Sequence, residues 1–139
     1  VSFSHMPGLS VAAIGRVSTV GVDLMQVETG VLELPDWRRV AWDYLGPAAS
    51  DVLRATPPAL RPAAFAEAWT SLEACLKCNG QPLTEWNLHL HRQFFLNCDV
   101  LQLALPENCR GTIAIQAGPG ATACAPRKHS TGEATGADQ

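Results

Sequence analysis

The sequence predicts an α+β fold, in which a small antiparallel sheet packs against one long helix. A helical pattern runs from about residue 62 to residue 80, and apolar runs of strand length lie on both sides of it. A length of 139 residues suits a single hydrophobic core. We therefore expect one domain over residues 1–117. We expect a disordered tail over residues 118–139, where the sequence shows neither a period nor a core.

The long helix has recognisable ends and one apolar face. Pro62 suits the first helical position because its missing N–H needs no partner there, and Asn79–Gly80 supplies a left-handed stop. At about 100° per residue, one arc of the helix collects the apolar side chains of Phe65, Trp69, Leu72, Cys75 and Leu76. The arc predicts that Cys75 is buried.

Glu73 and Lys77 stand four residues apart at the flank of that arc, so they are neighbours on the helix surface. The simplest interpretation is an ion pair that contributes a few tenths of a kcal/mol. The chain has only two lysines, however, and the other one, Lys128, lies in the predicted tail. This scarcity makes Lys77 a candidate functional residue.

Two apolar runs before the long helix predict strands. Residues 1–8 predict a loop or a strand start that a Pro–Gly turn closes, and residues 9–16 and 20–27 predict an antiparallel hairpin. Asp23 interrupts the second run. A carboxylate within a half-buried strand is costly unless it is paired or binds a metal, and the alternative is that Asp23 faces solvent at the edge of the sheet.

Two shorter helices are predicted between these runs and the long helix. The first covers residues 35–46, with Asp36 near its start and Gly46 after its end. The second covers residues 50–55, with Ser50 as its N-terminal cap.

After Gly80 the pattern changes from helical to alternating. Apolar Trp86, Leu88 and Leu90 alternate with polar Asn87, His89 and His91. This alternation predicts a strand with the histidines on its solvent face. Residues 99–105 and 111–117 flank a turn-like segment and predict a further hairpin.

Charge and composition exclude several classes of function. A net charge of −3 argues against broad nucleic-acid binding, which normally needs clustered Lys and Arg. No apolar run is long enough to span a bilayer and no signal-peptide pattern opens the chain, so we expect a cytoplasmic protein. Five cysteines, an odd number, do not indicate a disulfide framework.

Three blocks of the sequence together resemble the 4′-phosphopantetheinyl transferase superfamily, which converts apo carrier proteins to their holo form. Residues 3–8, FSHMPG, resemble the Ser-His block of that family, and residues 20–25, VGVDLM, resemble its Gly-x-Asp block. Residues 69–80, WTSLEACLKCNG, resemble its Trp-Ser/Thr-x-Lys-Glu-Ala/Ser-x-x-Lys helix. The blocks follow the order of the family, and the resemblance implies a phosphopantetheinyl transferase-like fold.

The resemblance implies a reaction in which a carrier-protein serine attacks the β-phosphate of coenzyme A and 3′,5′-ADP leaves. It implies that Asp23 and Glu73 hold a Mg²⁺ ion and that Glu73 also accepts the serine proton. Lys77 would stabilise charge on the diphosphate. Ser4 and His5 resemble the residues that contact the 3′-phosphate of coenzyme A. The implied partner is an acyl or peptidyl carrier protein.

The chain departs from the family pattern at two positions and in its length. Met25 stands where the family often has an acidic residue, and Leu72 stands where it usually has a basic one. Families with the Ser-His block usually contain two similar halves, and the single-domain branch builds its site between the subunits of a homotrimer. We therefore expect this chain to form a homo-oligomer or to be incomplete at its N-terminus. The alternative function is a non-catalytic remnant that binds coenzyme A or a carrier protein.

The cysteines offer a different interpretation, which is a zinc site. Its candidate ligands are Cys75, Cys78, Cys98, Cys109 and either His89 or His91. Against this site, the C-x-x-C pair lies within the predicted helix and Cys75 points into its apolar arc. Because a buried free cysteine is an ordinary small apolar residue, we expect Cys75 to be buried without a metal.

Overall fold

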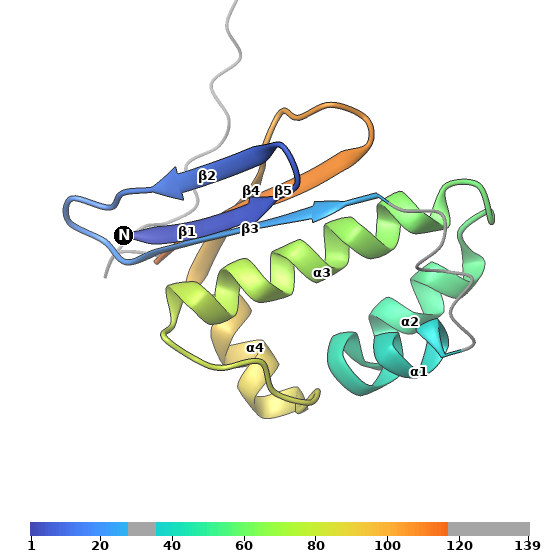
Figure 1. Cartoon of the computed structure of the whole chain (residues 1–139). Coiled ribbons are helices and arrows are strands. Elements are labelled where there is room, and N and C mark those ends of the chain that lie inside the picture. Colours follow the sequence, from blue (N-terminus) through green and yellow to red (C-terminus); the bar gives the residue numbers. More distant parts are fainter. Residues whose placement is uncertain (28–35, 117–139) are drawn as a thin grey trace, which may run out of the picture.

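The computed structural model describes residues 1–27 and 36–116 and confirms the α+β class. The strands are β1 (Ser2–Met6), β2 (Leu9–Ala13), β3 (Val20–Gln26), β4 (Cys98–Gln102) and β5 (Cys109–Gln116). The helical elements are α1 (Trp37–Val40), the π-helical segment η2 (Ala41–Leu45), α2 (Gly46–Ala55), α3 (Arg61–Cys78) and α4 (Leu88–Leu96). The strands lie on one side of α3, and α1, α2 and α4 lie on the other (Figure 1). The predicted tail, residues 118–139, falls outside the described residues.

Helix α3 is the long helix that the sequence predicts. Pro62 lies in its first turn, and Gly80 follows its end with a φ of 64°. The N–H of Gln81 donates to the carbonyl oxygen of Leu76 at 2.9 Å, so the last turn of the helix finds a partner beyond the glycine. Cys75 is fully buried, as the apolar arc predicts.

The larger sheet is antiparallel, with the strand order β3-β5-β4. The predicted hairpin after α4 is confirmed as the β4–β5 pair. Strand β5 also pairs along its length with β3, so its two neighbours come from opposite ends of the described chain. At the centre of β5, the Thr112 hydroxyl lies 2.8 Å from the Thr70 hydroxyl of α3, and both residues are fully buried. This contact joins the middle strand to the long helix.

The predicted hairpin between residues 9–16 and residues 20–27 is wrong. Strand β2 pairs with β1 across a two-residue turn, Pro7–Gly8, in which Gly8 has a φ of 79°. Strand β3 pairs with β5 instead. Nearness in sequence favoured the first pairing, but the Pro–Gly turn closes a tighter hairpin one strand earlier.

Strand β1 lies against β3 through side chains rather than through a backbone ladder. The hydroxyl of Ser2 accepts the N–H of Val22 at 3.0 Å, and the hydroxyl of Ser4 accepts the N–H of Leu24 at the same distance. These bonds satisfy two backbone N–H groups of β3 that have no partner strand on this side. The two sheets are therefore separate in backbone pairing but joined by serine hydroxyls.

Both short helices predicted before α3 are present, and they are divided at Gly46, whose φ of 85° and ψ of 176° are not helical. The first helical segment ends at Leu45 as predicted, but the prediction that Ser50 caps the second is wrong. Helix α2 begins at Gly46 and already includes Ser50 in its interior. Pro47 explains the earlier start, because proline suits the first turn of a helix. The Ser50 hydroxyl is buried and has no hydrogen-bond partner within the described residues.

The strand predicted around the two histidines is also wrong, because this segment forms helix α4. The side chain of Asn87 accepts the N–H of His89 at 3.0 Å, which caps the helix and starts it at the next residue. His91 is buried, and its Nε2 lies 3.0 Å from the carbonyl oxygen of Tyr44. The buried positions of α4, His91 and Phe94, have helical rather than alternating spacing. Only His89 is exposed as predicted.

Candidate functional site

Asp23 lies in the middle of β3 and is 9% exposed. Its Oδ1 accepts a hydrogen bond from Lys77 Nζ at 2.6 Å and another from Ser4 Oγ at 3.2 Å. The alternative in which Asp23 faces solvent is therefore wrong. A carboxylate at this depth needs compensation, and here a cation from α3 and a hydroxyl from β1 supply it.

Lys77 reaches Asp23 because α3 packs directly against β3. Its Nζ also donates to the carbonyl oxygen of Val22 at 3.1 Å. Gly21 permits this approach, since a Cβ at that position would overlap the carbonyl oxygen of Ala74 in α3. Gly21 is thus a positioning residue that was not predicted, although a glycine two residues before Asp23 was the signal for it.

Glu73 lies one turn before Lys77 on α3 and is half-buried. Among the ion pairs of residues 1–27 and 36–116, Lys77 pairs with Asp23, and the Glu73–Lys77 pair of the simplest interpretation is not formed. Burial raises the pKa of Glu73 above its ordinary value of 4.5; the negative charge of Asp23 raises it further, and Lys77 lowers it. Asp23, Glu73 and Lys77 therefore influence one another electrostatically.

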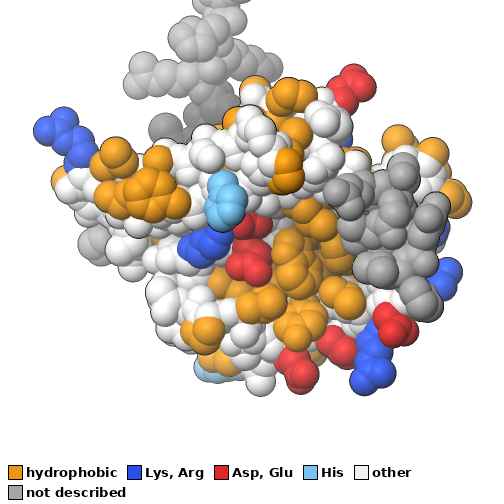
Figure 2. Space-filling model, viewed as in Figure 1, with side chains coloured by type: hydrophobic (Ala, Val, Ile, Leu, Met, Phe, Trp, Pro, Cys, Tyr) orange, Lys and Arg blue, Asp and Glu red, His pale blue; other side chains and the backbone are white. Residues whose placement is uncertain are grey.

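These groups open onto one face of the molecule. Figure 2 shows acidic, basic and histidine side chains next to one another at the centre of this face, with a hydrophobic area beside them. The charged groups come from β3 and α3, which are far apart in sequence and adjacent in the fold.

Ser4 and His5 lie on β1, beside β3. The Ser4 hydroxyl is already engaged, because it accepts from the N–H of Leu24 and donates to Asp23. His5 is exposed and, together with Ser4, lines a cavity of about 400 Å³ on the β1–β2 hairpin. Ser4 thus contacts the acidic centre directly, whereas His5 remains accessible to solvent.

The donor set of Asp23 and Glu73 fits a hard divalent cation. Neither the Oδ2 of Asp23 nor the carboxylate of Glu73 takes part in a hydrogen bond within the described part of the chain. Mg²⁺ needs few protein carboxylates, because water and substrate phosphates complete its shell. No group of three or more His, Cys, Asp and Glu side chains in the described ranges is arranged to hold a metal.

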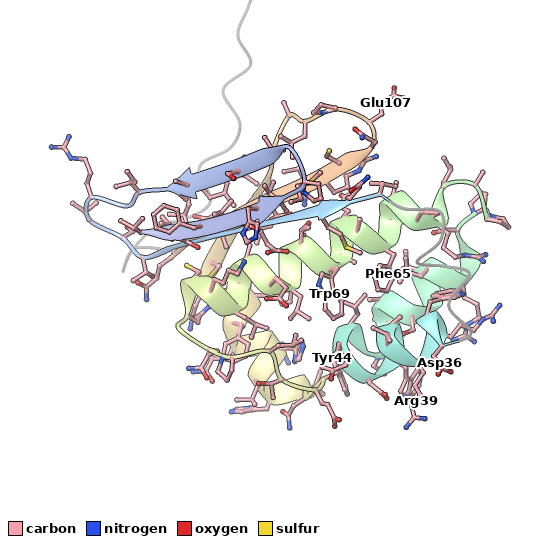
Figure 3. The ribbon with its side chains drawn as sticks, viewed as in Figure 1. Asp36, Arg39, Tyr44, Phe65, Trp69 and Glu107 are labelled. Atoms are coloured by element: carbon pink, nitrogen blue, oxygen red, sulfur yellow. The ribbon has the colours of Figure 1, made fainter. Side chains whose placement is uncertain are left out.

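The hydrophobic area near the charged groups includes aromatic side chains. Trp69 precedes Glu73 by one turn of α3 and stacks on Phe65 with ring centroids 5.9 Å apart. Tyr44, from η2, meets Trp69 edge-on at 5.8 Å (Figure 3). Met25 packs against the same cluster from the end of β3. Apolar packing thus explains the methionine that follows the Gly-x-Asp block.

Leu72, the second departure from the family pattern, is a core residue. It is 1% exposed and packs with Leu76 and Phe94. A basic side chain at this position would be buried among apolar ones, so Leu72 contributes to the contact between α3 and α4 rather than to the charged face.

The cysteines of the zinc interpretation divide between two places. One group, buried between α3 and the sheet, contains Cys75, Cys78 and Cys98. Cys109 lies at the start of β5, whereas Cys98 pairs with Gln116 at the end of that strand. Burial raises the pKa of Cys75 to about 12, and neighbouring thiols add to the shift. Burial likewise raises the pKa of Cys98 to about 11. These thiols are protonated at neutral pH, which agrees with Cys75 packing as a small apolar residue.

A helix long and apolar enough to cross a membrane is absent from the described ranges. Comparisons with protein-family models, with curated proteins and with solved structures found no match to this chain.

Proposed function

We propose that this chain transfers the 4′-phosphopantetheine arm of coenzyme A to a serine of an apo acyl or peptidyl carrier protein, with Mg²⁺. The observation that carries the proposal is the contact of Asp23 with Lys77, beside Glu73. Two sequence blocks far apart in the chain supply these three residues. The Ser-His block supplies the hydroxyl that touches Asp23. Convergence of all three blocks supports a phosphopantetheinyl transferase-like arrangement within the α+β class.

In this proposal Glu73 accepts the proton of the carrier serine, directly or through a water, while the serine oxygen attacks the β-phosphorus of coenzyme A. The bond from that phosphorus to the bridging oxygen breaks, and 3′,5′-ADP leaves with the electron pair. A raised pKa of Glu73 improves it as a base near neutral pH. Lys77 stabilises negative charge on the diphosphate as a compact cation.

Asp23 and Glu73 would hold the Mg²⁺, which when bound neutralises charge on the diphosphate. His5, exposed on β1, would contact the 3′-phosphate of coenzyme A. Ser4 would have to turn away from Asp23 to reach the same phosphate, so its first role is to hold β1 and Asp23 together.

A second candidate function is non-catalytic binding of coenzyme A or of a carrier protein. Two observations favour it: Leu72 is a core residue where the family usually has a charge, and Met25 packs into an aromatic cluster where the family often has a third acidic group. At Leu72 a cation that would face the diphosphate is missing, and at Met25 a further carboxylate that would help hold Mg²⁺ is missing.

The experiment that separates the two functions is mass spectrometry of apo carrier proteins incubated with the full chain, coenzyme A and Mg²⁺. Carriers from fatty-acid, polyketide and peptide synthesis should be tested, with the added phosphopantetheine arm as the readout. We expect transfer by the unmodified chain and a loss of about a hundredfold or more in rate for Glu73→Gln.

Glu67→Gln is the matched control, because Glu67 is an exposed glutamate on the same helix. We expect it to transfer at the unmodified rate. Coenzyme A binding without transfer to any carrier would establish the non-catalytic function, and equal transfer by Glu73→Gln would remove Glu73 from the mechanism.

A further inference from the structure

A cavity of about 550 Å³ lies between α2, α3 and α4, away from the charged face. Its wall is mainly apolar and includes Ala48, Ala68, Leu72, Trp86 and Phe95. The lining contains none of Asp23, Glu73 and Lys77. Its volume falls within the range of roughly 300–1,000 Å³ that small-molecule sites occupy. The cavity is therefore a candidate binding site separate from the proposed transferase site.

Arg92 is the charged side chain at this cavity. It is exposed and forms neither an ion pair nor a hydrogen bond through its side chain within the described residues. No Asp or Glu lines the cavity, so nothing in its wall neutralises the guanidinium. An anionic group is the complement of this charge.

The serine and histidine side chains of the wall are already engaged within the protein. The Ser71 hydroxyl donates to the carbonyl oxygen of Glu67 at 2.7 Å. The ring of His91 lies between the backbone of Asn87 and the carbonyl oxygen of Tyr44. Arg92 is therefore the side chain best able to orient a ligand, and the remaining wall offers mainly apolar contact.

We propose that this cavity binds an aliphatic carboxylate, with the hydrocarbon chain against the apolar wall and the carboxylate at Arg92. The inference does not depend on the proposed transferase function, because the two sites share no lining residue. A second copy of the chain is the other occupant that an apolar groove between helices accepts.

The test is isothermal titration of the full chain with decanoate, kept below the concentration at which it forms micelles. We expect saturable binding, with octanoate and hexanoate binding progressively more weakly, by roughly fourfold for each methylene removed. Decanol, which has the chain but no charge, should bind more weakly than decanoate.

Two variants locate the ligand. Ala48→Trp places a large side chain in the cavity from an exposed position on α2 and should abolish binding. Arg92→Gln should weaken decanoate by roughly two- to fivefold and leave decanol unchanged, because an exposed ion pair contributes little. Arg39→Gln, at an exposed arginine outside the cavity, is the matched control and should bind both ligands as the unmodified chain does.

Several outcomes would overturn the proposal. Unchanged binding by Ala48→Trp would place the ligand elsewhere, and equal weakening of decanoate and decanol by Arg92→Gln would remove the carboxylate from Arg92. A ligand-free dimer in sedimentation velocity that Ala48→Trp dissociates would assign the groove to a second copy. Glu73→Gln should still bind decanoate, because Glu73 does not line the cavity. The two proposals can therefore fail independently of each other.

Discussion

Lys77 binds Asp23, although Glu73 is its neighbour on the helix surface. The ammonium group donates both to the Asp23 carboxylate and to the carbonyl oxygen of Val22, at 2.6 and 3.1 Å. Two acceptors on one strand hold it better than a single carboxylate on a half-exposed helix face. The i,i+4 spacing placed Glu73 beside Lys77, but the partner of the lysine comes from another element, β3.

Removing Lys77 should therefore affect stability as well as function. The Asp23 side chain is only 12% exposed, so Lys77→Ala leaves a buried carboxylate with one hydroxyl as its remaining partner. We expect a loss of about 1–3 kcal/mol in the free energy of unfolding, measured by urea denaturation. This exceeds what an exposed pair with Glu73 would contribute.

Neutralising Asp23 separates the cost of burying an unpaired carboxylate from the other effects of truncating Lys77. In the Lys77→Ala background, Asp23→Asn should recover part of the lost stability, because an amide is less costly to bury than an unpaired carboxylate. If Lys77→Ala unfolds at the same urea concentration as the unmodified chain, the Asp23–Lys77 pair has no net stabilising effect.

Glu73 should make the protein less stable as the pH rises. Its folded-state pKa is raised above the ordinary value of 4.5, so the folded state binds more protons than the unfolded state between those two pKa values. Stability therefore falls as pH increases through that window, and the charged form remains unfavourable above it. Glu73→Gln should be more stable than the unmodified chain at neutral pH by a fraction of a kcal/mol, since water screens a half-exposed group.

Thermal melts at two pH values provide the measurement. One is about pH 4, below the ordinary pKa of a glutamate, and the other is about pH 7, well above it. The difference between Glu73→Gln and the unmodified chain should shrink at the lower pH. A glutamine variant that is less stable at neutral pH would contradict the raised pKa. A more stable but inactive variant is the pattern expected of a functional carboxylate.

At the scale of elements, the contact between α3 and β3 depends on Gly21. The helix backbone occupies the space that a side chain would need at this position, with the carbonyl oxygen of Ala74 in direct overlap. No rotamer change relieves such an overlap, because the obstructing atom is backbone. The helix and the strand would have to separate, which would also draw Lys77 away from Asp23.

Gly21→Ala should therefore destabilise the protein by about 3 kcal/mol in urea denaturation. Gly80→Ala is the matched control: Gly80 has a φ of 64° and open space around it, so alanine costs only its backbone conformation, about 1–2 kcal/mol. A loss at Gly21 no larger than the loss at Gly80 would show that α3 and β3 accommodate the added methyl group without the expected overlap.

The errors of strand assignment also belong to this scale. Alternation of apolar and polar residues around His89 and His91 predicted a strand, yet the Asn87 cap and the contact of His91 with Tyr44 favour a helix. The pattern covers only residues 86–91, which is too short to distinguish a strand period of two from a helical period of 3.6. The tertiary contact of His91 therefore favoured the helix.

At the scale of the whole molecule, α3 lies between the strands and the smaller helices, so it contributes to two surfaces (Figure 1). One flank carries Glu73 and Lys77 toward β3. Another flank, which includes Ala68 and Leu72, lines the cavity against α2 and α4. Changes on either flank can be tested independently because different side chains form each surface.

The boundary of the domain stays a prediction from composition. Residues 118–139 contain no periodic apolar pattern, so a chain that ends at residue 117 should retain the thermal midpoint of the full chain within about 2 °C. Differential scanning calorimetry of both chains provides the comparison. A drop of several degrees would show that this segment contributes to the core.

The sequence by itself determined the α+β class, the long helix with both of its ends, the β4–β5 hairpin and the burial of Cys75. Each depends on local information: a helical period, a proline and a glycine at the helix ends, or a turn between two short apolar runs. The same local reasoning selected Asp23 and Lys77 as candidates, because a carboxylate in a strand and a rare lysine are unusual wherever they lie, whereas the family resemblance selected Glu73.

Only the tertiary structure decided which of these groups meet. The pairing of β3 with β5, the Ser4 hydroxyl on Asp23 and the cation beside it join residues that are distant in sequence. The contact of Lys77 with Asp23 depends on the close approach of α3 to β3 at Gly21, and such packing depends on the shapes of all the elements together. Local patterns can identify the residues with unusual chemistry, but the distances between them exist only once the core has formed.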